Sequence, residues 1–310
     1  MISRNNHAIV VSALKHAAPY IRLFKGKVFV LKAGGEIFSD AAQTRSLMEQ
    51  VGILHQVGIR VVLIHGGGTQ STELAAALGV ESKFVDGRRV TDDASLDVAT
   101  MVLNGQINTR ILATCRNLQI PAVGISGVDA GLIRAHRRPP VERDGKAPVD
   151  YGYVGDIDSV DADILRKQLD NGLMPVVSPL SCDESGNVLN INADTVAAAI
   201  AAELDAEKLI LATGAAGVLE DVTDPQSLIS YIDRAALDKL RDDGKLAGGM
   251  LPKAAAIDAA LANGVQRVHI ISYKLADSLL LEVFTNEGTG TLVVNNIDAL
   301  TPAEQGGDDA

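Results

Sequence analysis

The sequence predicts an α/β fold in which helices cover both faces of a parallel sheet. Apolar runs rich in Val, Ile and Leu alternate with amphipathic stretches, and short connections join them, which is typical of such a sheet. Two of these runs end in glycine clusters that open the next helix. Five Phe, five Tyr and no Trp leave the core to aliphatic residues, which suits helices packed on strands.

Composition limits the classes of protein that fit. The 310 residues are 47% hydrophobic, which is enough for one large domain or two lobes, and no Pro-, Gly- or Ser-rich linker divides them. A formal net charge of −11 argues against nucleic acid and against anionic membranes as partners. No apolar run reaches membrane-span length, and residues 1–20 lack a signal-peptide pattern. Cys115 and Cys182 have no metal-binding spacing, so we expect free thiols and a cytoplasmic protein.

The N-terminal segment predicts an amphipathic helix over residues 6–24, which Pro19 should interrupt. This helix precedes the first strand, so residues 1–26 form an N-terminal helical extension. Its apolar face needs a cover, which either its own domain or another subunit would provide.

The first half of the chain predicts the following elements: a strand from residue 27, a helix over 41–57, a strand over 59–64, a helix over 70–78, a polar loop over 86–92, a helical stretch over 94–117 and a strand over 121–125. A hairpin is expected over 131–155, and we interpret the basic residues of its tip, 136–146, as a mobile, solvated loop.

The second half continues the alternation. It predicts helices over 161–169, 234–241, 254–262 and 276–284, and an alanine-rich helix within 190–204 that begins after a cap at Asn192 or Asp194. Strands are expected over 174–178, 187–191, 208–212, 265–271 and 291–294, with a glycine-containing loop over 213–221. The acidic residues 296–310 are expected to be disordered.

The stretch from Lys27 to Gly35, KVFVLKAGG, predicts a strand that carries Lys32 to a glycine turn. Ile59 to Gly68, IRVVLIHGGG, repeats the arrangement. A cation and bare backbone N–H groups at a helix N-terminus favour phosphate binding. Either stretch alone is an ordinary turn more often than a site. Because successive parallel strands end at one edge of the sheet, the repetition favours a single anion site there.

Two later motifs add charged groups to this edge. Asn190 to Leu204, NINADTVAAAIAAEL, places Asn192 and Asp194 at a strand-to-helix junction, where one of them would cap the helix. Lys253 follows a Gly-Gly turn at the head of a helix. Phosphoryl transfer needs little more than neutralised charge and aligned oxygens, which two lysines organised by one aspartate could supply. No carboxylate-rich cage is visible, so Mg²⁺ would bridge nucleotide phosphates.

The ordered motifs KVFVLKAGG, LIHGGG, GRRVTD, GISGVDAGLI, NINADTVAAAIA, GGMLPK and LLLEVFTNEGTGT resemble the acetylglutamate kinase branch of the amino acid kinase family. The resemblance spans about residues 17–295, and seven ordered motifs are far more specific than one glycine pattern. It implies a three-layer αβα sandwich around a mainly parallel, roughly eight-stranded sheet over residues 27–295. The N-terminal half would hold the acyl substrate, and the C-terminal half would hold the nucleotide.

The resemblance also implies a reaction: ATP, with Mg²⁺, phosphorylates the side-chain carboxylate of N-acetyl-L-glutamate in arginine biosynthesis. It implies that Lys32 and Lys253 contact the transferred group and that Asp194 organises them. Acyl-substrate binding falls to Gly66, Gly67, Gly68, Arg89, Asn190 and Asn192. Nucleotide binding falls to Gly34, Gly35, Thr213, Gly217, Gly249 and Met250, and no protein metal ligand is expected.

Some positions leave alternatives open. Ala33, Thr69, Gly214 and the segment 271–275 differ from the family pattern. Acetylaminoadipate is therefore an alternative substrate, and a catalytically weak regulatory module that binds an amino acid is an alternative function. A relative of carbamate or aspartate kinase is disfavoured by GRRVTD and NINAD. Residues 19–27, with His269, Glu282 and Gly288, resemble arginine-sensitive hexameric members, so L-arginine is a candidate effector and a homodimer or homohexamer is expected.

Overall fold

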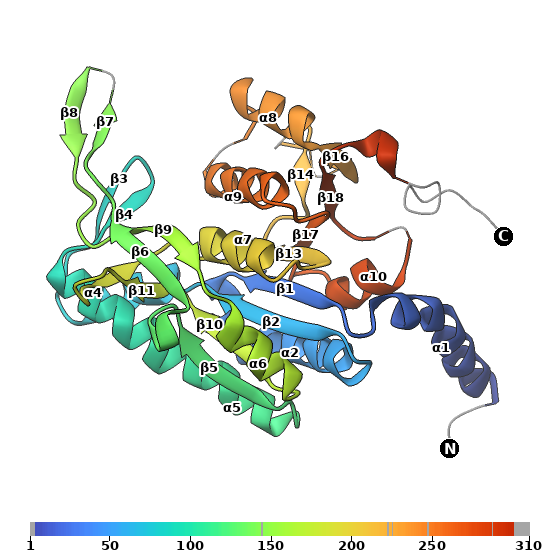
Figure 1. Ribbon diagram of the computed structural model, residues 1–310. Helices are drawn as coiled ribbons and strands as arrows, with labels where there is room; N and C mark the ends of the chain where they lie inside the picture. The colour runs from blue at the N-terminus through green and yellow to red at the C-terminus, as the bar shows by residue number, and fades with distance from the viewer. Residues whose placement is uncertain are drawn as a thin grey trace.

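The computed structural model describes residues 4–300 except 144, 222, 225, 247 and 287 (Figure 1). Its centre is an eight-stranded sheet in the order β16-β18-β17-β13-β1-β2-β10-β5. These strands are β1 Val28–Ala33, β2 Arg60–His65, β5 Ala122–Ser126, β10 Met174–Ser178, β13 Lys208–Thr213, β16 Tyr231–Asp233, β17 Val268–Ser272 and β18 Thr291–Val294. The five adjacent pairs from β17 to β5 are parallel, and β18 runs antiparallel to β17. The mainly parallel sheet is therefore confirmed.

Alternate residues of each strand enter opposite cores. On β1, Val30 faces one core, whereas Phe29 and Leu31 face the other. This follows from the two-residue period of a strand, and it explains why the buried strands have nearly continuous apolar sequences. Lys32 lies two residues after Val30 and shares its face, which is the face that α7 and α9 cover.

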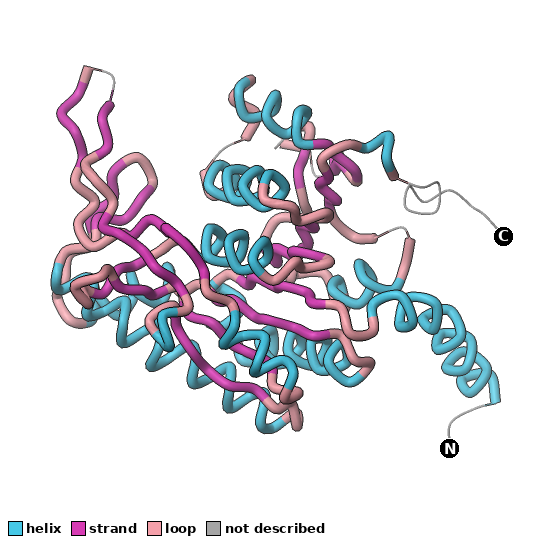
Figure 2. Tube along the Cα trace, viewed as in Figure 1, coloured by secondary structure: helices cyan, strands magenta, loops and turns pink. Residues whose placement is uncertain are grey.

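Helices pack on both sides of the sheet, as Figure 2 shows. Four of them line the core that contains Val30: α6 Asp163–Asp170, α7 Ala193–Glu203, α8 Arg234–Asp242 and α9 Met250–Ala262. The opposite core is lined by α2 Ala41–Gln56, α3 Gly68–Ala77, α4 Asp93–Thr100, α5 Thr109–Asn117 and α10 Ser278–Phe284. The expected three-layer αβα sandwich is thus present. Helix α9 begins at Met250, four residues before its expected start, so Lys253 lies in its first turn.

The helical stretch expected over residues 94–117 contains a feature that the sequence pattern did not predict. Between α4 and α5 the chain forms a π-helix, Met101–Asn108, which continues both helices. This wider segment brings Asn108 to the end of β2, where its Nδ2 lies 3.3 Å from His65 Nε2 and donates to the Val176 carbonyl at 3.0 Å. The π-helix is therefore fastened to the strand end that carries the HGGG turn.

The predicted hairpin is present and is more extensively paired than expected. A second sheet, in the order β12-β11-β6-β9, contains β6 Ile133–Arg137, β9 Gly155–Val160, β11 Leu180–Cys182 and β12 Val188–Asn190. The tip is a strand pair, β7 Val141–Arg143 with β8 Lys146–Val149, and it projects from the body in Figure 1. Two small ladders complete the strands: β3 Lys83–Val85 with β4 Arg88–Val90, and β14 Val218–Leu219 with β15 Leu228–Ile229.

Helix α1, Arg4–Phe24, is continuous through Pro19, so the expected interruption is wrong. The φ angle of proline already suits a helix. Because proline lacks a backbone N–H, the helix loses one hydrogen bond there, but it continues past this residue. The helix projects from the body (Figure 1), and within the described chain its contacts to the body lie near its C-terminal end. Phe24 is buried there, and the Tyr20 hydroxyl donates to Asn286 Oδ1.

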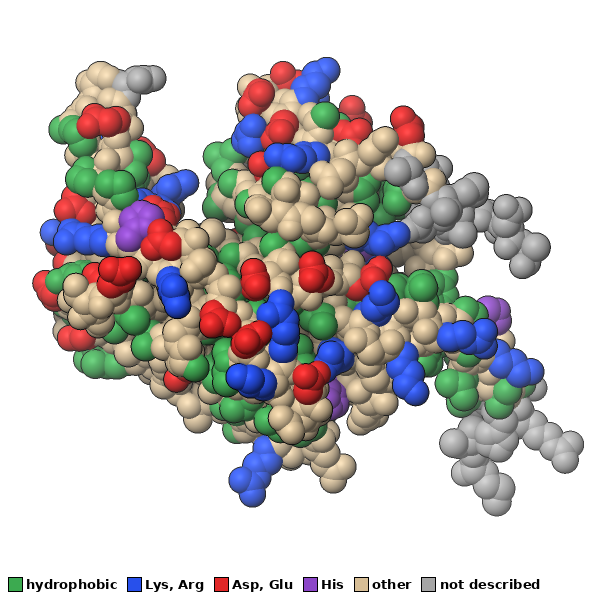
Figure 3. All heavy atoms as spheres, in the orientation of Figure 1, with side chains coloured by type: hydrophobic (Ala, Val, Ile, Leu, Met, Phe, Trp, Pro, Cys, Tyr) green, Lys and Arg blue, Asp and Glu red, His purple; other side chains and the backbone are tan. Residues whose placement is uncertain are grey.

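The apolar side chains of the projecting part of α1 are about two-thirds exposed at Ile9, Val10 and Leu14 (65%, 65% and 64%). Figure 3 shows hydrophobic side chains on this helix beside the body of the molecule. Within the described chain, its own domain therefore does not cover this face. Near the end of the described chain, residues Ile297–Ala299 form a 3-10 turn. The tail predicted to be disordered continues through residues 301–310, which lie outside the described residues. Across residues 4–300, apart from the five gaps, no helix has the length and apolarity to cross a bilayer.

Candidate active site

The two glycine turns lie side by side at the carboxyl ends of β1 and β2. The strands pair in parallel, with Ala33 opposite His65, so that both turns begin at the same level of the sheet. A Cβ atom at Gly35 would approach Gly67 Cα to 2.8 Å, which only glycine at this position avoids. The Gln70 side chain fastens the turns together, because its Nε2 donates to the Gly35 carbonyl at 2.5 Å. The interpretation that both turns face one site is consistent with this geometry.

Asp194 connects the two lysines singled out from the sequence. Lys32 Nζ lies 3.0 Å from Asp194 Oδ1, and Lys253 Nζ lies 3.3 Å from Asp194 Oδ2. Side-chain exposure is 8% for Lys32, 6% for Asp194 and 17% for Lys253. Each carboxylate oxygen thus holds one ammonium group, and the three groups come from β1, α7 and α9, which are far apart in sequence.

The local sequence places Asp194 at the start of α7. Asn192 is the helix N-cap, and its Oδ1 accepts hydrogen bonds from the backbone N–H of Asp194 at 2.8 Å and of Thr195 at 3.2 Å. Of the two residues expected to share the roles, Asn192 is the cap and Asp194 is left free for the lysines.

Burial and the neighbouring charges shift the pKa values of both Lys32 and Asp194. Burial lowers the pKa of Lys32 from its usual value, and the nearby ammonium of Lys253 lowers it further, against the opposing effect of Asp194. Burial by itself would raise the pKa of Asp194, but the two ammonium groups outweigh it, so that this pKa is lower than usual. Asp194 is therefore ionised at neutral pH.

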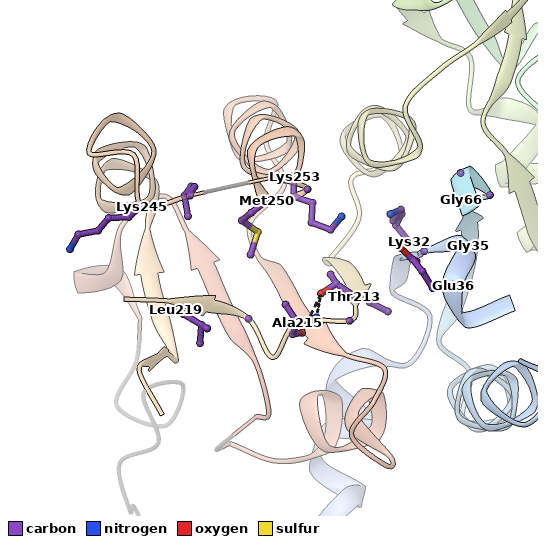
Figure 4. A pocket seen from close by; sticks show the side chains of 18 residues that line it. Lys32, Gly35, Glu36, Gly66, Thr213, Ala215, Leu219, Lys245, Met250 and Lys253 are labelled. Atoms are coloured by element: carbon purple, nitrogen blue, oxygen red, sulfur yellow. Dashed lines mark hydrogen bonds between the residues drawn. The ribbon is translucent and has the colours of Figure 1, made fainter. Parts of the chain in front are cut away.

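A cavity of about 460 Å³ opens beside Lys32 and Lys253 (Figure 4). All six residues predicted to bind nucleotide line it: Gly34, Gly35, Thr213, Gly217, Gly249 and Met250. Figure 4 shows Lys253 extending toward Lys32 and the Met250 side chain pointing into the space. Leu219, Leu246, Lys245 and Glu36 also line it and were not predicted. Their sequence signals are weak, because isolated leucines and surface charges occur on most helices and loops.

A second cavity of about 380 Å³ is also bordered by Lys32 and the HGGG turn. All six residues predicted to bind the acyl substrate line it: Gly66, Gly67, Gly68, Arg89, Asn190 and Asn192. Asp194 lines it as well, and Lys32 with Gly66, Gly67 and Gly68 lines both cavities. Arg88, Arg138 and Tyr151 are further lining residues that the sequence reasoning missed. For Arg138, the interpretation of the hairpin tip as a merely solvated loop is wrong.

Arg89 is a half-buried cation that contacts only uncharged groups. Its guanidinium donates to Ser82 Oγ at 2.7 Å, to Thr72 Oγ1 at 2.7 Å and to the Gly68 carbonyl at 3.1 Å. It also lies over the Phe84 ring, 4.7 Å from the centroid. Burial lowers its pKa, and among the described residues no carboxylate pairs with it. A guanidinium held in this way is suited to an anionic ligand.

The donor set gives little support for a metal held by protein alone. Among the residues that the structure describes, no group of three or more His, Cys, Asp and Glu could hold a metal ion. Glu36 is the one carboxylate among the residues lining the first cavity. A divalent cation here would therefore take most of its ligands from a nucleotide and water.

Two departures from the family pattern lie next to each other. A Cβ at Gly214 would lie 3.4 Å from the Tyr273 hydroxyl and 3.5 Å from Lys274 Cε. The segment 271–275 thus comes close to the space that a larger side chain at position 214 would need. Ala33 is fully buried at the end of β1, away from the Lys32 side chain.

The sequence profile of the amino acid kinase family matches residues 27–272. The acetylglutamate kinase of Myxococcus xanthus is 46% identical over 298 residues, which cover 94% of this chain and 96% of that protein. The acetylglutamate kinase of Symbiobacterium thermophilum is 44% identical and covers 91% and 97%.

Solved structures agree with this result. An N-acetylglutamate synthase from Neisseria gonorrhoeae, complexed with coenzyme A and L-arginine, matches with a TM-score of 0.80 and 30% identity over 92% of this chain. This chain spans 65% of the length of that synthase. A carbamate kinase from Giardia lamblia, at 17% identity and a TM-score of 0.61, shares the fold. The chain belongs to the amino acid kinase family, in its acetylglutamate kinase branch.

Proposed function

We propose that this protein transfers the γ-phosphoryl group of ATP to the side-chain carboxylate of N-acetyl-L-glutamate, a step of arginine biosynthesis. The observation that carries the proposal is the position of Asp194, which holds Lys32 and Lys253 between two cavities that share a wall of glycine N–H groups. The curated acetylglutamate kinases, at 40–46% identity over most of the chain, favour this acceptor over acetylaminoadipate and over a non-catalytic module.

The proposed reaction needs no covalent intermediate on the enzyme. An oxygen of the acceptor carboxylate in the second cavity would form a bond to the γ-phosphorus, and the bond from that phosphorus to the bridging oxygen of ADP would break. Lys32 and Lys253 would neutralise the oxygens of the group in flight, and the N–H groups of Gly66 and Gly67 would bind the same oxygens. Asp194 would keep both ammonium groups in place.

The first cavity suits the nucleotide. Leu219, Leu246 and Met250 offer apolar contacts to a base, while the glycine turns and lysines offer donors to phosphates. Mg²⁺ would supply charge neutralisation for the phosphates, and Glu36, the carboxylate among the described residues lining this cavity, could bind one of its water ligands.

An assay with hydroxylamine tests the proposal directly, because an acyl phosphate is trapped as a coloured hydroxamate. The wild-type protein would be incubated with ATP, Mg²⁺ and, in parallel, N-acetyl-L-glutamate, N-acetylaminoadipate, glutamate or aspartate. We expect the highest kcat/KM with N-acetyl-L-glutamate. A preference for acetylaminoadipate would change the substrate, and no hydroxamate with any acceptor would refute the enzymatic function.

We also propose that L-arginine is an effector and that the protein is a homo-oligomer of the cytoplasm. A buried cluster at the end of α1 supports the effector. His269 Nε2 lies 3.1 Å from Lys208 Nζ, and His269 Nδ1 lies 2.6 Å from Glu282 Oε1. The Lys208 ammonium lies over the Phe24 ring, 5.0 Å from its centroid. The Neisseria synthase carries L-arginine in its complex. Initial rates titrated with L-arginine, combined with light scattering, test both points, and a dimer whose rate is unaffected at millimolar arginine would refute the effector.

A further inference from the structure

Arg138 lies where the β6–β9 hairpin borders the second cavity. Its backbone N–H donates to the Val154 carbonyl at 2.8 Å, which fixes the chain immediately after β6. Its side chain is mostly buried, with 21% exposed, and it lines the second cavity together with Tyr151, Val154 and Asn190. A cation therefore lies in the wall of the space assigned to the acyl substrate.

Asp156 fixes one edge of this guanidinium. Arg138 Nε donates to both carboxylate oxygens at 3.1 Å, and Nη2 donates to Oδ1 at 2.5 Å. Within the described chain Nη1 has no hydrogen-bond partner, so the outer edge of the fork keeps donors for a ligand. An aspartate that orients one edge of an arginine lowers the entropy cost of binding a second anion at the other edge.

The neighbouring Arg137, the last residue of β6, provides a contrast. It pairs with Asp150, donates to the Gly152 carbonyl and is about half exposed. It lines neither cavity. An arginine in this hairpin therefore does not line the second cavity merely because it is near the tip. Of these two neighbours, Arg138 lines it and Arg137 does not.

The charges of the second cavity leave room for a second carboxylate on the substrate. Its cationic lining residues are Lys32, Arg88, Arg89 and Arg138, and its one lining carboxylate, Asp194, is engaged by the two lysines. An N-acylated acidic amino acid carries two carboxylates. The reacting one belongs beside Lys32, so the other needs a cation from elsewhere in the wall.

We propose that Arg138, oriented by Asp156, binds the non-reacting α-carboxylate of the acyl substrate together with Arg89, and so determines specificity for an acylamino acid with a free α-carboxylate. This inference rests on the proposed function. The two arginines come from different elements, β4 and the end of β6, so that the hairpin and the β3–β4 ladder would both be drawn to the bound substrate.

The test compares Arg138→Met with Arg137→Met on two acceptors in the hydroxamate assay. N-acetyl-L-glutamate has the α-carboxylate, whereas N-acetyl-L-isoglutamine has an uncharged α-carboxamide and the same reacting carboxylate. With N-acetyl-L-glutamate, we expect Arg138→Met to raise KM about 10- to 100-fold, the range for a lost hydrogen bond to a charged group, and to leave kcat within about threefold. With the carboxamide, the same substitution should change KM less than about twofold. Arg137→Met should leave both KM values unchanged.

Two further variants separate binding from a structural effect. Arg138→Lys keeps the charge but loses the fork, so it should restore part of the affinity, and Asp156→Asn should raise KM less than Arg138→Met does. If Arg138→Met raises KM equally for both acceptors, its role is structural and the inference is overturned. An unchanged KM for N-acetyl-L-glutamate with an active wild-type enzyme overturns the inference alone. An inactive wild-type enzyme refutes the proposed function and this inference with it.

Discussion

At the scale of single residues, the site depends on the carboxylate of Asp194. Two ammonium groups share it, one on each oxygen, and all three side chains are largely removed from water. Taking charges out of water is costly, and the cost is offset only while the partners remain paired. Removing the shared acid should therefore affect folding as well as catalysis, whereas removing one lysine leaves the other pair intact.

Asp194→Asn tests this dependence. The substitution preserves shape but leaves Lys32 and Lys253 without a counter-charge, so we expect a loss of about 3 kcal/mol or more in the free energy of unfolding. Urea denaturation measures the loss, and the hydroxamate assay should show no activity. A variant as stable as the wild type would mean that the ion pairs do not hold the site together.

Lys253→Met is the matched variant. Asp194 keeps its 3.0 Å contact with Lys32, and methionine leaves no unpaired charge of its own, so the free energy of unfolding should fall by less than in Asp194→Asn. We expect kcat to fall at least about 100-fold, as for other groups that stabilise charge in a transition state. An unchanged kcat would refute the role assigned to Lys253.

The pH dependence of the rate should follow Lys32. Only the protonated amine neutralises phosphoryl charge, and burial lowers its pKa from the usual lysine value. As pH rises through this lowered pKa, the amine loses its proton and kcat/KM falls, so the alkaline limb should begin below the ordinary lysine range. A profile that stays flat up to that range would contradict the assignment.

At the scale of elements, the π-helix determines the close packing of the HGGG turn. A Cβ at Gly67 would lie 2.6 Å from Ile107 Cδ1 and 2.7 Å from Leu103 Cδ2, both carried by Met101–Asn108. Asn108 holds the same segment against β2. The position of the turn is therefore set by a helix from a different part of the chain.

Gly67→Ala and Gly68→Ala form a pair that measures this packing. Overpacking against Ile107 and Leu103 should lower the free energy of unfolding of Gly67→Ala by about 1–3 kcal/mol. At Gly68, the first residue of α3, a Cβ meets nothing within 4 Å, and alanine favours a helix by about 1 kcal/mol or less, so no loss is expected. Equal stabilities in thermal or urea unfolding would show that the π-helix yields to the added methyl group.

At the scale of the whole molecule, α1 is an apolar surface without a cover in the described chain. Ile9, Val10 and Leu14 are exposed, and the contacts of this helix to the body in the described chain lie at Tyr20 and Phe24. A second copy of the chain is the cover that we propose, consistent with the expectation of a homodimer or homohexamer. Such a patch exceeds what isolated surface residues present, which favours this proposal.

The double variant Val10→Asp with Leu14→Asp should reduce the mass measured by light scattering, because two charges would be buried in the contact. Far-UV circular dichroism and the hydroxamate rate of the smaller species should be retained, since α1 lies outside both cavities. Ser12→Asp adds a charge to the opposite face of the same helix and serves as the control. An unchanged mass in the double variant would remove α1 from the interface.

Sequence alone determined the fold class, the pair of glycine turns and the set Lys32, Asp194 and Lys253. These could be predicted because each has a local signature: alternating periodicity, a strand that breaks on glycine, or a charged residue at a helix start. The rule that parallel strands end at one edge then brings the signatures together without coordinates.

Only the tertiary structure decided that Arg138 and not Arg137 lines the second cavity, that a π-helix packs on Gly67, and that α1 leaves its apolar face uncovered in the described chain. The physical reason is that these features depend on contacts between segments far apart in the chain. Neither hydrophobic periodicity nor residue type reports which distant partner a side chain meets.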